Sequence, residues 1–479
     1  MRQSRLGLLL LSLILLLGLV MTSVAAQIPA APQQLQTTYL PIVRLAGQPS
    51  IFGVETTLGQ LSNAVVRQRA AELGIAWVRI NGVAWHVVQP NEGVAPDWTV
   101  DTIVRLERDL EAAAALGIEP TVIIRGAPEW AAIIPTARCS AIRDDRLAAY
   151  AVFLEELAAR YRDRVTYWEL GNEPDVDPTL INGNWPFGCL GNIADPYYGG
   201  GRYGEMLQVA SAALRRGNPQ AKIVFGGLLL DRPETTDPLL GNPERFLEGA
   251  LIAGAANALD VVAFHSYPSY SSSRFEDQDF MAISPWTPRG GFTVGKINFV
   301  REVMSRYGVS KPVWINEMGL ISCDTTNPLC TVPLAEFEQV QAEHVVRVMS
   351  RAAANGVQML AWYTLNNSGW RNSSLLGANQ TPKPVYFSYQ HMIRTVSPYL
   401  SVRTVDYGPN IEAYRFDQGN QVVDVLWSRT ATPTKVRVPL NRNPQTSTLN
   451  GTGSVPGRTD GFDAIITVGF TPIYITRLP

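Results

Sequence analysis

The sequence predicts an α/β protein, a (β/α)8 TIM barrel followed by a C-terminal antiparallel β-sandwich-like domain. Eight short runs with the composition of buried strands recur between residues 51 and 367. Stretches with apolar residues at i, i+3 and i+4, the spacing of amphipathic helices, lie between these runs. Beyond residue 400, short strand-like runs continue without helices between them, separated by Gly, Asn and Pro turns.

The expected barrel strands are rich in β-branched and aromatic residues, and they span 51–55, 77–81, 121–126, 165–174, 222–228, 261–268, 312–319 and 359–367. The expected helices cover 61–73, 101–116, 145–161, 203–216, 293–306 and 335–355. Alternating strands and helices indicate parallel strands joined by crossovers, and eight units match the TIM barrel. An open doubly wound sheet is the alternative, but no GxGxxG turn follows the first run.

The chain divides into four segments. Arg2 and Arg5 precede an apolar stretch that ends in small residues, so residues 1–26 are expected to be a signal peptide, with a membrane anchor as the alternative reading. Residues 27–49 form a Gln/Pro/Ala-rich linker that could end by adding a strand elsewhere. The barrel is expected over 50–397 and the β domain over 398–479.

Composition and charge narrow the function classes. Hydrophobic residues make up 46% of the chain and charged residues 17%, which is typical of a compact globular protein and excludes a disordered one. The 40 Lys and Arg residues nearly balance the 42 Asp and Glu residues, so no global field attracts nucleic acid or anionic lipid. We expect a monomer that touches a membrane only if the N-terminal segment stays uncleaved.

The four cysteines predict two disulfides in an exported protein. Cys323 and Cys330 flank a turn-rich segment that closes easily, which leaves Cys139 and Cys189 to pair. Zinc binding is the competing interpretation, but the chain has no CxxC motif and only four histidines. We therefore expect no metal site and no organic cofactor.

Two carboxylates follow opposite strands of the expected barrel. The fourth strand ends in Gly-Asn-Glu-Pro with Glu173, and the seventh ends in Asn-Glu-Met-Gly with Glu317. The carboxyl ends of barrel strands meet at one mouth, where active sites lie. Two carboxylates at a glycosidic bond can divide the chemistry, one protonating the leaving oxygen and the other attacking or activating water.

These motifs resemble those of the clan A retaining β-glycoside hydrolases, nearest to glycoside hydrolase family 39, with family 5 next. The resemblance covers roughly residues 50–397 and rests on WELGNEP (168–174), FHSYP (264–268) and WINEMG (314–319). It implies that Glu173 is the general acid/base, that Asn172 binds the sugar 2-hydroxyl and that Glu317 is the nucleophile. It also places Tyr267 and His265 beside the nucleophile, although a structural role is favoured for His265.

Further candidates surround this pair. Arg79 could donate hydrogen bonds to the ionised nucleophile or form a buried ion pair with Glu169 or Glu55. Trp362 resembles the aromatic platform under the cleaved sugar, and Trp130 is the first choice among six tryptophans in loops after strands, which suggest an extended groove. The six are Trp85, Trp98, Trp130, Trp185, Trp286 and Trp370.

The chain also departs from its relatives. Gly171 stands where many relatives carry an aromatic residue before Asn-Glu-Pro. Arg125-Gly126 stands where family 5 usually has a histidine, and Glu129 just beyond is a spare carboxylate. The sugar bound is therefore left open.

The sequence thus predicts a secreted or cell-surface retaining glycoside hydrolase that cleaves β-linked O-glycosidic bonds of a poly- or oligosaccharide by double displacement. A catalytically silent carbohydrate-binding barrel and a transglycosylase that uses the same residues are the alternatives.

Overall fold

A computed structural model of the chain describes residues 50–180, 188–234, 239–270, 273–282, 284–323, 330, 332–367 and 369–479, together with the backbone of Ile42–Val43. The expected signal peptide, most of the 27–49 linker and Trp185 lie outside the described residues. Among the described residues, no helix combines the length and apolar character needed to span a bilayer.

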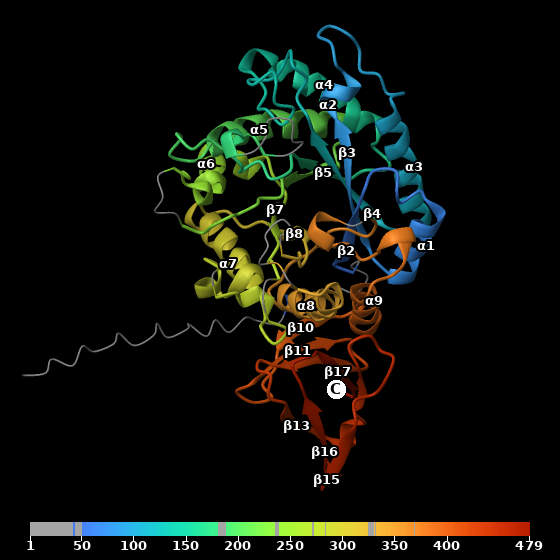
Figure 1. Cartoon of the computed structure of the whole chain (residues 1–479). Coiled ribbons are helices and arrows are strands. Elements are labelled where there is room, and N and C mark those ends of the chain that lie inside the picture. The colour runs from blue at the N-terminus through green and yellow to red at the C-terminus, as the bar shows by residue number, and fades with distance from the viewer. Residues whose placement is uncertain are drawn as a thin grey trace, which may run out of the picture. The chain divides into compact units, whose positions relative to one another are not determined.

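Eight parallel strands form a barrel, as expected (Figure 1). The sheet order is β6-β5-β4-β3-β2-β9-β8-β7, and backbone bonds from Phe225 N to Val261 O (2.9 Å) and from Leu228 N to Ala263 O (3.0 Å) join its two ends. The strands are β2 (Phe52–Thr56), β3 (Trp77–Ala84), β4 (Glu119–Arg125), β5 (Tyr167–Leu170), β6 (Lys222–Phe225), β7 (Val262–Ser266), β8 (Val313–Met318) and β9 (Leu360–Trp362).

Helices cover the outside of the barrel (Figure 1). Those expected from the periodicity are α1 (Ala64–Leu73), α3 (Asp101–Leu116), α4 (Leu147–Arg160), α5 (Gly200–Gly217), α7 (Gly291–Arg306) and α8 (Leu334–Ala354). Three more were not expected, namely α2 (Trp85–Val88), α6 (Phe246–Ile252) and α9 (Pro384–Val396). The first two are too short to show a helical period, and α9 is rich in aromatic and β-branched residues, which favour strands in isolation.

Side chains along each barrel strand alternate between the helices and the lumen. Val78 and Ile80 belong to the main hydrophobic core under the helices, whereas Arg79 between them faces inward. An apolar layer fills the amino-terminal end of the lumen, where the rings of Trp77, Tyr167 and Trp314 lie 5.0–5.3 Å apart. The charged residues of the lumen therefore lie between this apolar layer and the carboxyl ends of the strands.

The C-terminal domain is a two-sheet sandwich, as expected. One sheet has the order β1-β10-β11-β12-β17-β14 and the other β13-β16-β15, and apolar residues of both sheets form a common core. The strands are β1 (Ile42–Val43), β10 (Ser401–Thr404), β11 (Ile411–Asp417), β12 (Val422–Ser428), β13 (Thr434–Pro439), β14 (Gln445–Ser447), β15 (Gly457–Asp460), β16 (Asp463–Val468) and β17 (Ile473–Arg477). β1 pairs with β10, so the 27–49 segment does contribute a strand.

A buried arginine links the barrel to the sandwich. Arg351 of α8 donates to both carboxylate oxygens of Glu412 on β11, at 2.8 and 3.0 Å. The same guanidinium pairs with Asp277 and Asp279, which lie between β7 and α7. Arg351 is 1% exposed, so this cluster is shielded from water.

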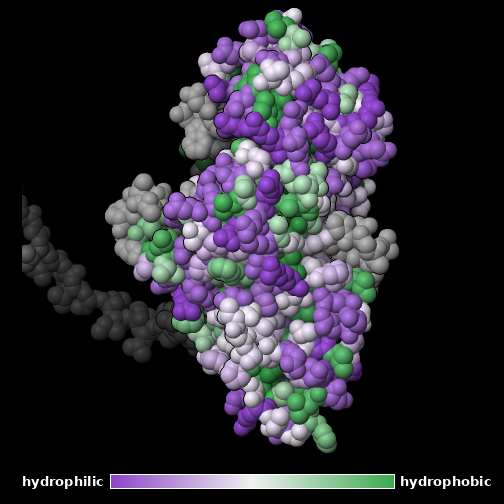
Figure 2. All heavy atoms as spheres, turned by 90° about the vertical axis from the view of Figure 1, so that its right-hand side faces the viewer, coloured by the Kyte–Doolittle hydropathy of each residue, from purple (hydrophilic) through white to green (hydrophobic). Residues whose placement is uncertain are grey.

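One face of the molecule carries mostly hydrophilic side chains. In Figure 2 the hydrophobic residues on that face form small patches separated by hydrophilic ones. Among the residues coloured in Figure 2, this face therefore shows no extended apolar surface.

Candidate active site

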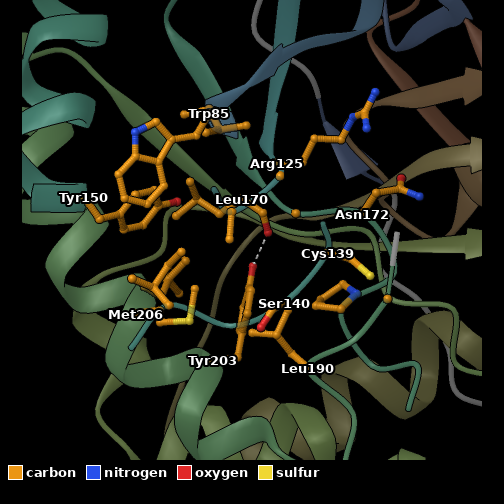
Figure 3. Close-up of a pocket in the computed structure, with 18 residues that line it drawn as sticks. Trp85, Arg125, Cys139, Ser140, Tyr150, Leu170, Asn172, Leu190, Tyr203 and Met206 are labelled. Carbon is orange, nitrogen blue, oxygen red and sulfur yellow. Dashed lines mark hydrogen bonds between the residues drawn. The ribbon is translucent and has the colours of Figure 1, made fainter. Parts of the chain in front are cut away.

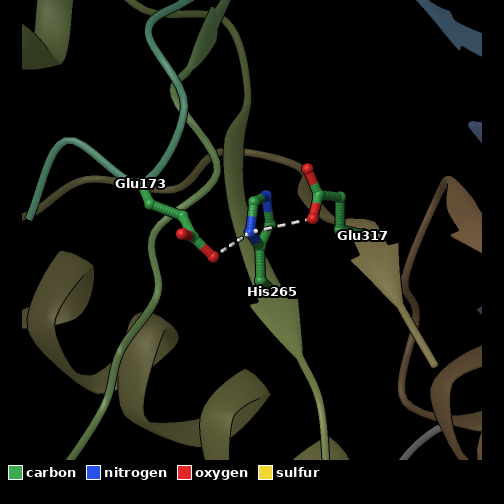
Figure 4. A group of neighbouring side chains, drawn as sticks. All are labelled: Glu173, His265 and Glu317. Carbon is green, nitrogen blue, oxygen red and sulfur yellow. Dashed lines mark hydrogen bonds and ion pairs between the residues drawn. The ribbon is translucent and has the colours of Figure 1, made fainter. Parts of the chain in front are cut away.

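The barrel brings Glu173 and Glu317 together at the carboxyl ends of β5 and β8. One oxygen of each carboxylate and Nδ1 of His265 all lie within 4.8 Å of one another. Figure 4 shows the imidazole of His265, from β7, between the two carboxylates. Its Nδ1 lies 2.8 Å from Glu173 Oε1 and 3.4 Å from Glu317 Oε2.

A tight turn directs Glu173 into the site. Gly171 has φ +81° and Glu173 itself has φ +49°, a left-handed conformation that is uncommon outside glycine. The backbone N–H of Glu173 donates to Gly227 O at 2.9 Å, which holds the turn against the end of β6. A strained backbone held in this way is typical of functional residues.

Glu317 is fixed by two donors. The guanidinium of Arg79 donates to Oε1, and the hydroxyl of Tyr267 donates to Oε2 at 2.6 Å. Glu317 is 7% exposed, so these bonds form in a largely dry environment. Two such donors suit a carboxylate that carries its negative charge.

Arg79 is the centre of a buried ionic network. Its guanidinium donates to Glu169 at 2.7 and 2.8 Å, to Asn172 Oδ1 at 2.6 Å and also to Glu55. Burial, only partly opposed by Arg79, raises the pKa of Glu55 well above its usual range, so this carboxyl group is harder to ionise than a free one.

The sequence left two hypotheses open for Arg79, a hydrogen bond to Glu317 and a buried ion pair, and the structure contains both interactions. It forms the ion pairs with Glu55 and Glu169 and also holds the candidate nucleophile. Its side chain is 0% exposed, and its expected contact with substrate stays a prediction. Arg79 contacts both Glu317 and Asn172.

Removing Arg79 should destabilise the fold strongly. We expect Arg79→Met to lower the free energy of unfolding by about 3–5 kcal/mol, because it leaves buried carboxylates without their cation. The control is Arg105→Met on α3, where an exposed pair with Asp101 (2.8 Å) is removed at a cost of at most about 1 kcal/mol. Urea unfolding measures both values, and equal small losses would contradict the central role of Arg79.

Glu173 and His265 have opposite protonation tendencies. Burial raises the pKa of Glu173 to about 7, although the charges of Arg79 and Lys296 oppose the rise. Burial lowers the pKa of His265 to about 4, so its imidazole is neutral at pH 7. Across the 2.8 Å contact between His265 Nδ1 and Glu173 Oε1, the raised pKa of the carboxyl group favours its protonated form up to about neutral pH.

His265 is enclosed between the two carboxylates and the end of β6. It is 0% exposed, which is consistent with the favoured structural role, and its assignment to substrate binding stays a prediction. A Cβ on Gly227 would lie 2.1 Å from its Nε2, so only glycine leaves room for the ring. Lys296 of α7 donates to the carbonyl oxygens of His265 and Leu229, each at 2.8 Å, and fixes the ends of β7 and β6.

Glu173, His265 and Glu317 are also the group within the described residues whose ligand atoms are close enough together to hold a metal ion. The hydrogen bonds that Glu317 already accepts argue against metal binding. Both oxygens of Glu317 accept hydrogen bonds, one of them from the positively charged Arg79. A dication there would lie beside a fixed guanidinium, so the arrangement suits acid and nucleophile chemistry better.

The structure places the ring of Trp362 away from the carboxylates. Trp362 is 0% exposed, donates to Ser373 O at 2.7 Å and packs towards His344 of α8 at 6.4 Å, on the helix side of the barrel. The next residue, Tyr363, lies at the site, with its ring 5.9 Å from that of Tyr267. Strand alternation could have found it, because Ala361 faces the lumen.

Trp370 is the exposed aromatic residue beside the site. It is 50% exposed, and its ring lies 5.5 Å from that of Tyr267. Trp130 instead packs edge-on against Trp85 at 5.1 Å and donates to Gln89 O at 3.4 Å, and none of these contacts reaches the carboxylates. Trp85 and Trp286 are buried in the core.

Both expected disulfides are present. Cys139 after β4 is bonded to Cys189 after β5, with 5.4 Å between their Cα atoms. Cys323 and Cys330 after β8 are bonded, with 5.6 Å between theirs. All four cysteines lie in segments that follow the carboxyl ends of strands, so the bridges constrain the loops of the catalytic face.

Solved structures share this fold. A family 39 glycoside hydrolase from Bacteroides cellulosilyticus is 19% identical, with a TM-score of 0.66 over 90% of this chain and 81% of its own. A family 30 subfamily 8 xylanase from Clostridium acetobutylicum is 14% identical, with a TM-score of 0.58 over 91% and 99%. A family 51 α-L-arabinofuranosidase from Bifidobacterium longum is 14% identical, with a TM-score of 0.56 over 92% and 97%.

No protein-family model and no curated protein matches the sequence. Over about nine-tenths of the chain, the fold is thus the one that these glycoside hydrolases of families 39, 30 and 51 share.

Proposed function

We propose that the protein is a retaining glycoside hydrolase that cleaves β-linked O-glycosidic bonds of a poly- or oligosaccharide. The carboxylate pair carries this proposal, since one oxygen of Glu173 and one of Glu317 lie within 4.8 Å of each other. Retaining enzymes separate their carboxyl groups by about 5–5.5 Å, whereas inverting enzymes leave about 6.5–9.5 Å for a water molecule. The short separation favours double displacement.

In the first step, Glu317 attacks the anomeric carbon while Glu173 gives its proton to the leaving glycosidic oxygen. The carbon–oxygen bond breaks, and the sugar is bound to Glu317 as an ester. In the second step, the Glu173 carboxylate takes a proton from water, whose oxygen attacks the same carbon and releases Glu317. Asn172, held by Arg79 at 2.6 Å, is the residue that would contact the hydroxyl next to the anomeric carbon.

The aromatic residues supply a surface for the sugar. Sugar rings present apolar C–H faces that pack on aromatic side chains. Tyr363 and the half-exposed Trp370 flank Tyr267 at the nucleophile, so the platform expected at Trp362 is assigned to them. The two disulfides favour an extracellular location, because such bonds persist in oxidising compartments.

A substrate panel tests the proposal. Purified protein is incubated with aryl α- and β-glycosides and with plant and bacterial polysaccharides, and the released sugars are identified. The anomer must be tested directly, since one structure with this fold is named as an α-L-arabinofuranosidase. Proton NMR of the first product should show retained configuration. Binding without hydrolysis would support a carbohydrate-binding barrel, and transfer products without free sugar would support a transglycosylase.

The pH profile should report the protonation of Glu173. The acid must be protonated, so kcat/KM on a substrate with a poor leaving group should fall as the pH rises above about 7. An activated aryl glycoside, which needs no proton in the first step, should lack this basic limb. Asp175 is the control, because burial also raises its pKa to about 7. If deprotonation of Asp175 caused the fall in kcat/KM at high pH, the fall would be equal for both substrates and would be absent in Asp175→Asn.

A further inference from the structure

A second arginine faces the lumen of the barrel above Arg79. Along β4, Val122 and Ile124 belong to the core under the helices, whereas Ile123 does not. Alternation then places Arg125, the last residue of the strand, on the lumen side at the mouth. Its guanidinium donates to Asn81 Oδ1, and Asn81 lies two residues after Arg79 on β3.

Arg125 differs from Arg79 in its partners. Arg79 contacts three carboxylates, but among the described residues no carboxylate lies within ion-pair distance of Arg125. Its side chain is nonetheless partly buried, and burial lowers its pKa, while the charge of Glu55 acts on it from a longer distance. A guanidinium has five N–H donors in a planar fork, and the bond to Asn81 uses Nε, so the fork of the two terminal nitrogens is available.

A second cation lies close by. The carbonyl oxygen of Arg138 accepts a bond of 2.8 Å from Ala127 N, two residues beyond Arg125, and the Cys139–Cys189 disulfide follows directly. Arg138 is exposed and has no described ion-pair partner, and its charge adds to the lowering of the Arg125 pKa. Two neighbouring cations without a carboxylate repel each other, and an anion between them would relieve the repulsion.

Arg125 lies near the turn that carries Glu173. Arg125 and Asn172 line one cavity of about 60 Å³, and Asn172 directly precedes Glu173. In Figure 3 the side chains of Arg125 and Asn172 extend towards the same side, away from Tyr150 and Met206 on the apolar side of the cavity. A group bound by Arg125 would therefore belong to the sugar that Asn172 contacts or to its neighbour.

We propose that Arg125, assisted by Arg138, binds a carboxylate of the substrate, so that the enzyme acts on glycans that contain uronic acid. The planar fork of a guanidinium matches the two oxygens of a carboxylate. The inference rests on the proposed hydrolase function, and it names the substrate class that the fold leaves open. A sulfate ester offers similar charge on a tetrahedral group and is distinguished in the experiment.

Matched substrate pairs test the proposal. Aryl β-glucuronide and β-galacturonide are compared with the aryl β-glucoside and β-galactoside, and a polyuronide is compared with its carboxyl-reduced form and with a sulfated glycan. We expect kcat/KM to favour the uronides. Arg125→Gln should lower this preference about 10- to 100-fold, with little change on neutral sugars, because a bond to a charged group is lost. Arg125→Lys should keep only part of the preference for uronides. Arg105→Gln on α3 should leave that preference unchanged.

Binding to an inactive protein separates this inference from the proposed function. Glu317→Ala protein is titrated with free glucuronate, galacturonate, inorganic sulfate and the neutral sugars, and thermal stabilisation is measured. Uronate stabilisation that disappears with Arg125→Gln supports the site even if no substrate is ever cleaved. Hydrolysis without uronate preference, equal loss on charged and neutral substrates in Arg125→Gln, or stabilisation by sulfate alone would each overturn the proposal.

Discussion

Glu317→Ala should lower kcat/KM by about 10⁵-fold or more on every substrate, because the loss of a nucleophile removes the first covalent step altogether. A substrate with an activated aryl leaving group should not restore the activity of this variant, because its anomeric carbon still needs a nucleophile. Added azide should fill the space of the missing carboxylate and yield a glycosyl azide of inverted configuration. Initial rates and proton NMR of the azide product measure both effects.

Glu129→Ala is the matched control for this substitution. Glu129 is an exposed carboxylate in the loop after β4, so its removal should change kcat/KM less than about threefold. A loss at Glu129 comparable to that at Glu317 would mean that the carboxylate pair has been misassigned.

Glu173→Ala should have an effect that depends on the substrate. We expect a loss of about 10²–10⁴-fold where the leaving group is poor, the usual contribution of general acid catalysis, and a far smaller loss with an activated aryl leaving group. Azide should attack the glycosyl-enzyme in this variant and give a product of retained configuration. The comparison of rates across leaving groups and the NMR of the azide product test the assignment.

The stereochemistry of the azide products distinguishes the two roles. Retained product from Glu317→Ala with inverted product from Glu173→Ala would reverse the assignment of acid and nucleophile. Undiminished hydrolysis of a confirmed substrate by both variants would place the active site elsewhere.

The fold was predictable because its signal is local. Buried parallel strands appear as short β-branched and aromatic runs, and their alternation with helical periods specifies the barrel. The carboxylate pair was predictable for a related reason, because residues that end different barrel strands must converge at one mouth. Helix α6, with seven residues, lacks the length that makes a helical period visible.

The details of the site were harder to predict because they depend on which face of a strand each side chain occupies. A shift of one residue exchanges Trp362 for Tyr363 and moves an indole from the lumen to the helix side. The sequence also left open whether Arg79 binds Glu55, Glu169 or the nucleophile, since the three carboxylates come from strands far apart in the chain. The lumen brings all three to one guanidinium.

The cluster around Arg351 makes the sandwich an integral part of the enzyme rather than a detachable appendage. A chain cut after α9 would leave the Arg351 guanidinium without Glu412. It would also expose to water the surface of the barrel that the sandwich covers. Barrel and sandwich should therefore unfold in one cooperative transition, and exchange of the sandwich between homologues should succeed only when the α8 surface is exchanged with it. Asp277 and Asp279 on the segment after β7 share this arginine with Glu412, so one buried guanidinium contacts both the sandwich and that segment of the barrel.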